Sequence, residues 1–175
     1  VNAAGHAHGG DSKEYREAAE IADRALARAL AHIDLTQDAI IVTADHGHTG
    51  RGGHGGLEPE VLTVPLIMAG AGVKPGAISL DAHLIDIAPT VSALLGIPAP
   101  GHGLGRTLVE LLQLDDNAAA ARVIADQQRL TMTRAVLAGS EARAEVAVLE
   151  QRALRIGMVI GGALLAAALG YLRVR

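Results

Sequence analysis

The sequence is organised around the stretch Ile40-Ile41-Val42-Thr43-Ala44-Asp45-His46-Gly47-His48-Thr49-Gly50-Arg51-Gly52-Gly53-His54-Gly55-Gly56. Residues 39–44 predict a fully buried strand, because this run is rich in large and β-branched side chains and ends shortly before a glycine. Asp45 and His46 follow at the carboxyl end of the strand, where ligands bind in open α/β sheets. A carboxylate beside an imidazole suits a divalent metal such as zinc or manganese. The alternative is a flexible surface loop of histidine and glycine that binds metal only incidentally.

The composition is that of a globular protein. The chain has 175 residues, of which 50% are hydrophobic, and this is enough for one domain with a core. Because cysteine is absent, the chain has neither a disulfide framework nor a thiolate site. The net charge is −4, the basic residues are scattered and the only aromatic residues are two tyrosines, which argues against nucleic acid as a partner. The first residue is Val1 rather than methionine, so we expect the chain to be the C-terminal part of a longer protein.

A second segment rich in histidine and glycine occupies residues 2–10, and we interpret it as a functional loop. Asp11 and Glu14 fit a helix cap with a glutamate three residues later, so a helix is predicted to begin near Ser12. Its apolar residues recur at steps of three and four as far as Ile33. The helix and the strand after it lead from the first histidine segment to the second. We therefore expect both segments to converge on one site.

Further elements are predicted downstream. Residues 61–69 form a candidate strand, in which Pro65 indicates an edge or a bulge. Residues 86–96 have an acidic start, an early proline and a final glycine, which are typical of a short helix. A loop is expected at residues 98–105, followed by a short helix or strand at residues 106–112.

The composition changes at Asp115. Residues 118–155 are rich in alanine, arginine and glutamate, and they predict two helices, separated near Gly139-Ser140, that form a stalk or pack on the domain. Residues 156–172 carry no charge and have arginines on both sides, which predicts a transmembrane helix about 25 Å long. The alternative is a buried core helix. The expected divisions of the chain are residues 1–114, residues 115–155 and residues 156–172.

The candidate metal ligands are Asn2, His6, Asp45, His46 and His54, with His8 and His48 in reserve. The motifs Asn2-Ala3-Ala4-Gly5-His6, Thr43-Ala44-Asp45-His46-Gly47 and Gly53-His54-Gly55 are similar to the metal motifs of the alkaline phosphatase superfamily. The closest branches are its type I phosphodiesterases, nucleotide pyrophosphatases and phosphoethanolamine transferases. Residues 64–67 and 86–96 also resemble this superfamily and its sulfatase relatives. The likeness covers roughly residues 1–112.

This resemblance implies an α/β fold, with an alkaline-phosphatase-like sheet and flanking helices. It also implies two divalent metal ions, for which we expect zinc, with manganese or magnesium as alternatives. One ion is assigned to Asp45 and His46, and the other to His6, His54 and the residue at position 2. Two such ions can bind the nucleophile and a phosphoryl oxygen, and they stabilise the charge that develops on the transferred group.

Two positions depart from the pattern of the family. Relatives have aspartate where this chain has Asn2, and an amide brings no charge, so the second metal site is expected to be weaker or vacant. Asp11 is an alternative ligand, although we favour its role as a helix cap. His48 stands where many relatives have an apolar residue. We expect it either to support the ligands from behind or to contact the substrate, with plain exposure as the alternative.

The function implied by the resemblance is that of a membrane-anchored, metal-dependent hydrolase or transferase acting on phosphate mono- or diesters. The catalytic domain is expected on the extracytoplasmic side. The nucleophile of the family, a threonine or serine, has no counterpart in these motifs and is expected upstream, so the chain alone should be inactive. The alternatives are a sulfatase-like hydrolase and an inactive relative that keeps the fold as a metal-binding module.

Overall fold

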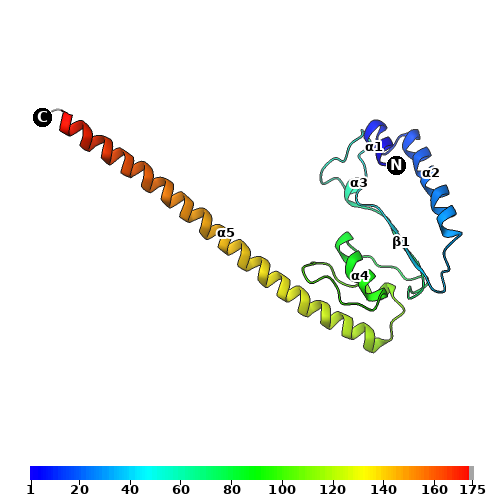
Figure 1. The fold of residues 1–175 in the computed structure, drawn as a ribbon. Helices are drawn as coiled ribbons and strands as arrows, with labels where there is room; N and C mark the ends of the chain where they lie inside the picture. Colours follow the sequence, from blue (N-terminus) through cyan, green and yellow to red (C-terminus); the bar gives the residue numbers. More distant parts are fainter. Residues whose placement is uncertain (174–175) are drawn as a thin grey trace. The chain divides into compact units, whose positions relative to one another are not determined.

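The structure, a computed structural model, describes the backbone of residues 1–173 and the side chains of residues 1–155 and 158. The chain divides into two compact units, Val1–Asp126 and Gln127–Arg175. The first unit combines helices with one small sheet (Figure 1), which agrees with the predicted α/β class in this coarse form. The finer division at residue 114 stays a prediction.

The first element is α1 (Asn2–His8), a helix where we predicted a loop. The prediction was wrong because the alanines of this segment favour helix and outweigh its single internal glycine. The helix ends at Gly9, whose φ of 87° and ψ of 160° only glycine adopts readily. Helical geometry places Asn2 and His6 four residues apart on one face of α1.

The second element is α2 (Lys13–Leu30), which begins close to the predicted position. Its cap is Ser12, whose Oγ accepts a hydrogen bond from the backbone N–H of Tyr15 at 3.0 Å. The predicted cap at Asp11 is therefore wrong by one residue, and the carboxylate of Asp11 is not needed to start the helix. Figure 1 shows α1 beside the first turns of α2.

The sheet consists of β1 (Ala39–Thr43) and β2 (Leu66–Gly70), which pair antiparallel with Thr43 opposite Leu66. The predicted strand after α2 is confirmed, but its residues are half-buried or exposed rather than fully buried. Burial is lower than expected because, among the described residues, each strand has only one partner strand.

The connection between the strands contains α3 (Pro59–Leu62), a short helix that takes the first residues of the strand predicted at 61–69. Pro59 stands at the start of this helix, where its fixed φ is favourable and its missing N–H has no consequence. Pro65 directly precedes β2, as expected for a residue that cannot donate to a ladder hydrogen bond.

The second half of the unit contains η1 (Leu84–Asp86), α4 (Ile87–Leu94) and η2 (Val109–Leu111). The short helix predicted at residues 86–96 is confirmed, and Gly96 follows it at a φ of 68°. The buried apolar side chains of the described residues include Val61, Val73, Pro89, Leu108, Leu111 and Leu112. Most of the core therefore lies around α4 and η2, away from the histidines.

Asp86 connects the segments of this core. Its side chain is 3% exposed, and its Oδ1 and Oδ2 accept hydrogen bonds from the backbone N–H groups of Arg106 at 2.7 Å and His83 at 2.9 Å. The Oγ1 of Thr90 accepts from the N–H of Leu108 at 3.0 Å and donates to the carbonyl of Asp86 at 2.6 Å. Two segments distant in sequence, residues 83–90 and 106–108, are thus held together by buried side chains that are hydrogen-bonded.

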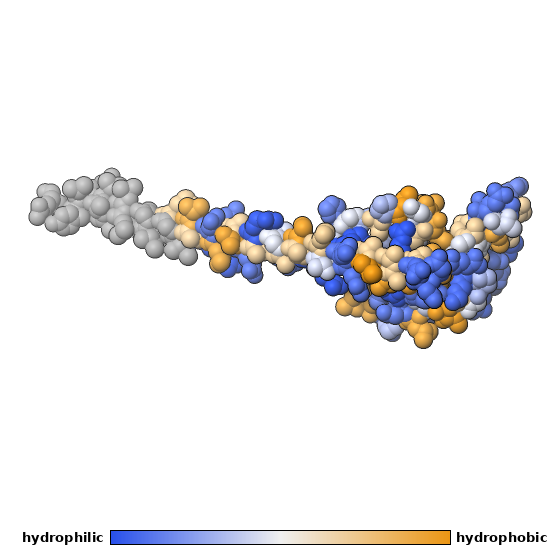
Figure 2. Space-filling view, turned by 90° about the horizontal axis from the view of Figure 1, so that it is seen from below, coloured by the Kyte–Doolittle hydropathy of each residue, from blue (hydrophilic) through white to orange (hydrophobic). Residues whose placement is uncertain are grey.

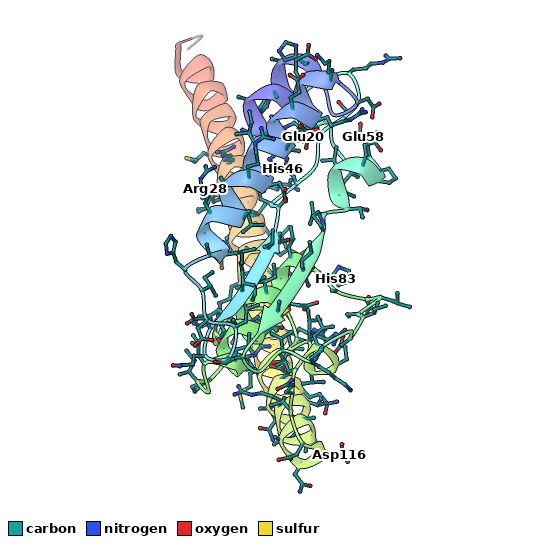
Figure 3. The ribbon with its side chains drawn as sticks, turned by 90° about the vertical axis from the view of Figure 1, so that its right-hand side faces the viewer. Glu20, Arg28, His46, Glu58, His83 and Asp116 are labelled. Atoms are coloured by element: carbon teal, nitrogen blue, oxygen red, sulfur yellow. The ribbon has the colours of Figure 1, made fainter. Side chains whose placement is uncertain are left out.

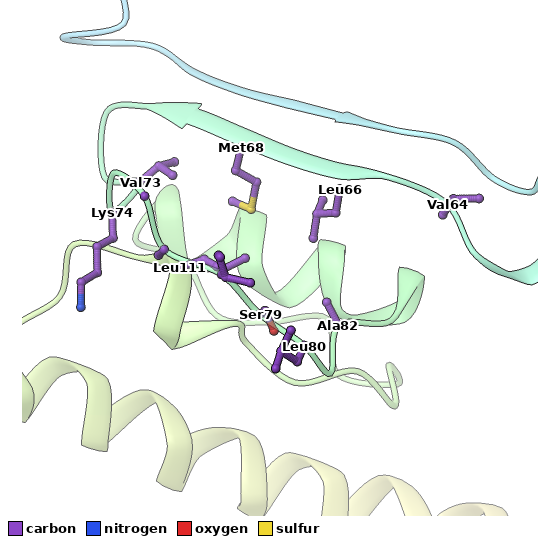
Figure 4. A pocket seen from close by; sticks show the side chains of 12 residues that line it. Val64, Leu66, Met68, Val73, Lys74, Ser79, Leu80, Ala82 and Leu111 are labelled. Carbon is purple, nitrogen blue, oxygen red and sulfur yellow. The ribbon is translucent and has the colours of Figure 1, made fainter.

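A cavity of about 350 Å³ lies beside β2 (Figure 4). Its lining includes Leu66 and Met68 of β2 and Leu80 of the following loop, and it contains no histidine or carboxylate. This cavity has no ligands for a metal. Leu80 is 98% exposed, and Figure 2 shows further apolar patches on the surface.

The last element is α5 (Asp116–Arg173), which begins in the first unit and makes up the second. The prediction of two helices was wrong, because Gly139 inside a helix costs only about 1 kcal/mol and Ser140 Oγ donates back to the carbonyl of Leu137 at 2.7 Å. Within the part of the chain that was described, no helix is long and apolar enough to cross a membrane. The transmembrane helix predicted at residues 156–172 lies, except for residue 158, outside the described side chains.

An ion pair between Arg106 and Glu110 gives this unit an acid-sensitive contact. Arg106 donates from Nη1 and Nη2 to the two carboxylate oxygens of Glu110 at 3.0 and 2.9 Å, and Ser79 Oγ donates at 2.7 Å. Hydrogen bonds from Arg106, aided by Ser79, lower the pKa of Glu110 from 4.5 to about 2. Because the folded state prefers the carboxylate, this contribution to stability is present above pH 4.5 and is lost as the pH falls towards 2.

We therefore expect Glu110→Gln to remove part of the acid sensitivity of the protein. Both partners are about one-third exposed, so solvent screens the pair and the expected loss is only about 1 kcal/mol. The measurement is the free energy of unfolding of the native chain and of Glu110→Gln between pH 5 and pH 2. A difference between them that is the same at every pH would contradict this role.

Candidate metal site

The loop after β1 carries three of the predicted ligands. Asp45 and His46 follow β1 after a single residue, Ala44, and Figure 3 shows His46 beyond the strand. The next residue, Gly47, donates its N–H to the carbonyl of Val61 at 2.8 Å. A Cβ at position 47 would collide with the carbonyl oxygen of Glu60, so only glycine lets the loop approach α3 this closely.

A tight turn brings the chain back from His48 to His54. Thr49 Oγ1 donates to the carbonyl of Gly52 at 2.8 Å, and the N–H of Gly52 donates to the carbonyl of Thr49 at 3.1 Å. Gly52 and Gly53 both have positive φ angles, which allows the chain to reverse within a few residues. The hydroxyl of Thr49 is thus used in a hydrogen bond within the loop.

Four imidazole rings meet at this loop. The ring centroid of His54 lies 4.0 Å from that of His46 and 4.3 Å from that of His6. His48 lies 5.2 Å from His46 and 5.5 Å from both His6 and His54. The structure therefore brings the two histidine segments together, as the sequence predicts. The role of these side chains as metal ligands stays a prediction.

His46 has one ring nitrogen available for a ligand. Its Nδ1 lies 2.8 Å from the carbonyl oxygen of Gly47, and because a carbonyl can only accept, Nδ1 carries the hydrogen. In the neutral ring, Nε2 then keeps a free lone pair, and it lies 3.7 Å from Oδ2 of Asp45. In histidines that bind a metal through one ring nitrogen, the other ring nitrogen usually donates a hydrogen bond, often to a backbone carbonyl.

Crowding makes two of these rings, those of His48 and His54, harder to protonate. Desolvation, followed by the nearby His46 and His6, lowers the pKa of His54, and the carboxylate of Asp45 opposes this effect. The same causes lower the pKa of His48, for which His54 also contributes. Neutral imidazoles are the form that binds divalent metals.

The remaining candidates lie in different surroundings. Asn2 Oδ1 is 3.1 Å from Nε2 of His48, so the amide faces a histidine. Asp11 lies beside Gly50, where an added Cβ would collide with its carboxylate. His8 is exposed on α1 and takes no part in the ring contacts of the described residues.

Sequence reasoning missed Tyr15 of α2, which was not among the candidate site residues. Its hydroxyl lies 3.4 Å from Nδ1 of His48, and the two ring centroids are 5.4 Å apart. One signal could have found it, since Tyr15 is one of only two aromatic residues and follows the first histidine segment closely.

The residues fit a divalent metal in donor type and in proximity. Imidazoles and one carboxylate are the donors that zinc and manganese accept. Their arrangement is not that of a closed coordination sphere: among the described residues, no group of three or more histidine, cysteine, aspartate or glutamate side chains is placed to hold a metal ion. The carboxylate of Asp45 is 90% exposed, so it would have to turn towards Nε2 of His46 to complete a site.

A pocket of about 600 Å³ opens beside the cluster. Its lining includes His46 and His48 from the loop. Asp11, which precedes α2, Tyr15 of α2 and Glu60 of α3 also line it. The pocket is therefore polar on the side of the histidines and large enough for a small organic molecule.

The chain is similar to several curated enzymes. It is 36% identical to a 2,3-bisphosphoglycerate-independent phosphoglycerate mutase of Ruegeria pomeroyi, over 58% of this chain and 21% of the relative. It is 41% identical to the alkaline phosphatase PhoV of Synechococcus elongatus, over 35% of this chain and 11% of the relative. It is 28% identical to GPI ethanolamine phosphate transferase 1 of Homo sapiens, over 66% of this chain and 15% of the relative.

These relatives are phosphoryl-transferring enzymes, and the chain spans about a fifth of their length or less. No solved structure gives a significant match. The model of the Metalloenzyme superfamily matches residues 2–99, which is more than half of the chain and includes every predicted ligand. The chain therefore belongs to the Metalloenzyme superfamily, and the predicted relationship to alkaline phosphatase is confirmed.

Proposed function

We propose that this chain contributes metal ligands to an enzyme that hydrolyses or transfers phosphate esters. The proposed ligands are His6, Asp45, His46 and His54. When bound, divalent ions would supply a charge that binds a phosphoryl oxygen and stabilises the transferred group. The chain's own residues orient the imidazoles and form the pocket of about 600 Å³ beside them.

The observation that carries this proposal is the hydrogen bonding of the His46 ring. Its Nδ1 is tied to the carbonyl of Gly47, its Nε2 is left with a lone pair, and the ring of His54 lies 4.0 Å away, centroid to centroid. Membership of the superfamily and the names of the relatives support phosphate esters as the substrate class. Zinc is the proposed metal because imidazole predominates among the donors.

Metal binding by the 175-residue chain tests the ligands. We expect Zn²⁺ affinity, measured by calorimetry, to fall by about 100-fold or more in His46→Ala and in His54→Ala, since loss of a direct ligand should exceed the usual effect of a supporting residue. His32→Ala is the control, because His32 is exposed in the turn after α2. Equal Zn²⁺ affinity in all four proteins would contradict the assignment.

Activity of the full-length protein tests the substrate class. We expect hydrolysis of p-nitrophenyl phosphate or bis(p-nitrophenyl) phosphate that depends on added Zn²⁺ or Mn²⁺ and is lost in His46→Ala. Preferred hydrolysis of p-nitrophenyl sulfate would instead support a sulfatase. Metal binding without turnover would support the inactive metal-binding module, an alternative favoured by the contact between Asn2 and His48.

We also propose that residues 156–172 anchor the protein in a membrane, with the metal site on the extracytoplasmic side. The support is the sequence alone: this segment has no charge and is flanked by arginines at positions 155 and 173. Deleting residues 156–175 from the full-length protein should convert it from a form that needs detergent for extraction into a soluble form. Extraction of the intact protein by salt alone would exclude the anchor.

A further inference from the structure

His48 lies at the centre of the contacts between α1, α2 and the histidine loop. Its side chain is buried, with 7% of its surface exposed. The other three rings of the cluster belong to less buried residues. Because buried polar side chains need partners, the hydrogen bonds of this ring decide its role.

Both ring nitrogens of His48 are occupied. Nε2 faces Oδ1 of Asn2 at 3.1 Å, and because an amide oxygen only accepts, Nε2 carries the hydrogen. Nδ1 is then the acceptor for the hydroxyl of Tyr15 at 3.4 Å. Unlike His46, this ring has no lone pair left for a metal, and the oxygen of Asn2 is turned towards His48.

The ring also fixes how closely α1 approaches the loop. Gly5 is buried, and a Cβ built on it would lie 2.7 Å from Nε2 of His48 and closer still to Cδ2. The backbone of α1 thus rests on the face of the imidazole. The adjacent hydrogen bond from the N–H of Gly10 to the carbonyl of Thr49, 2.9 Å long, continues this contact. The position of His6 on α1 therefore depends on His48.

We propose that His48 is a positioning residue that holds α1, and with it His6, against the loop of His46 and His54, and that Asn2 is its hydrogen-bond partner rather than a metal ligand. The second metal site is then left with two imidazoles. The metal in this proposal rests on the proposed function, but the contacts of His48 with Asn2 and α1 do not require a metal.

A double-mutant cycle on the 175-residue chain separates the two roles of Asn2. We expect Asn2→Ala to weaken Zn²⁺ binding by about tenfold in the native background, the usual effect of a supporting residue. In a His48→Leu background it should have no further effect, within about twofold, because its partner is already gone. If Asn2→Ala weakens Zn²⁺ binding equally in both backgrounds, Asn2 is a direct ligand and the proposal fails.

Nitrogen-15 NMR of the histidine rings, recorded without metal, is a second test of the hydrogen bond between His48 and Asn2. It does not depend on the folding of His48→Leu. We expect an Nε2–H signal from His48 in the native chain and its loss, or rapid exchange with solvent, in Asn2→Ala. An unchanged signal in Asn2→Ala overturns the proposal. If the signal changes as expected while His54→Ala leaves Zn²⁺ binding intact, the contact stands and the proposed function fails.

Gly5→Ala tests the packing of α1 on His48 without replacing Asn2, Tyr15 or His48. We expect this variant to shift the His48 ring signals and to weaken Zn²⁺ binding by about tenfold. Gly139→Ala is the matched control, because Gly139 is also helical but an added Cβ would meet nothing within 4 Å apart from the neighbouring backbone of its own helix. Unshifted His48 signals in Gly5→Ala would show that α1 does not rest on this ring.

Discussion

Gly9→Ala is expected to lower the free energy of unfolding by about 3 kcal/mol, the upper end of the cost of backbone strain. Gly9 has a φ of 87° and a ψ of 160°, a region that is essentially restricted to glycine. A Cβ there would also collide with the carbonyl oxygen of Gly50 and lie 2.9 Å from the nitrogen of Gly52. Since both neighbours are backbone, neither can rotate away, and α1 must separate from the loop.

Gly53→Ala is the matched control for this prediction. Gly53 has a φ of 79°, but no atom lies within 4 Å of the position of its Cβ. Its substitution therefore adds strain without a collision and should cost about 1 kcal/mol. Urea denaturation followed by circular dichroism measures both variants. Equal losses of stability would mean that a Cβ at Gly9 does not collide with Gly50, and that α1 lies farther from the loop.

Asp86→Ala is expected to destabilise the first unit by about 3–5 kcal/mol, because two backbone N–H groups lose a charged acceptor. The side chain is 3% exposed, so little water is available to replace it. Asp86→Asn keeps one acceptor oxygen and should lose about half of this free energy. Unfolding curves in urea give the differences in the free energy of unfolding, provided that the dependence of this free energy on urea concentration is the same in all proteins.

Asp81 provides the control for charge in the same region. Its carboxylate is 83% exposed and lies 3.3 Å from Nε2 of His83, a polar contact that water screens. Asp81→Ala should therefore change the free energy of unfolding by less than about 1 kcal/mol. If it destabilises the protein as much as Asp86→Ala, the effect is one of net charge and not of the buried hydrogen bonds.

Local signals in the sequence predicted α2, β1 and α4 well, because each has a start or stop residue whose physics is independent of the rest of the chain. They failed at residues 2–10, where we gave glycine and histidine more weight than the alanines of α1. They failed again at Val61, since a helix of one turn beginning at Pro59 gives no periodic pattern. The burial of β1 depends on how many strands pair with it, and a local sequence pattern does not predict this number.

The site was predicted in outline. The order of helix and strand indicated that His6, His46 and His54 would meet, and the ring distances of 4.0 and 4.3 Å agree with this. The partners of His48 could not be predicted, because Asn2 and Tyr15 reach it only in the folded chain, where α1 packs on the His48 ring at Gly5. Such tertiary contacts decide which ring nitrogen keeps a lone pair for a metal, and local sequence patterns do not predict them.

The pairing of Thr43 with Leu66 makes residues 44–65 a closed loop, and Asp45, His46 and His54 all lie inside it. Closing a loop costs conformational entropy that rises slowly with length, by about 0.6 kcal/mol for each doubling. His6 lies outside this loop and joins the cluster across a longer stretch of chain. We therefore expect the β1–β2 hairpin to form before α1 docks, and the first species on the folding pathway to hold His46 and His54 together while His6 is still free.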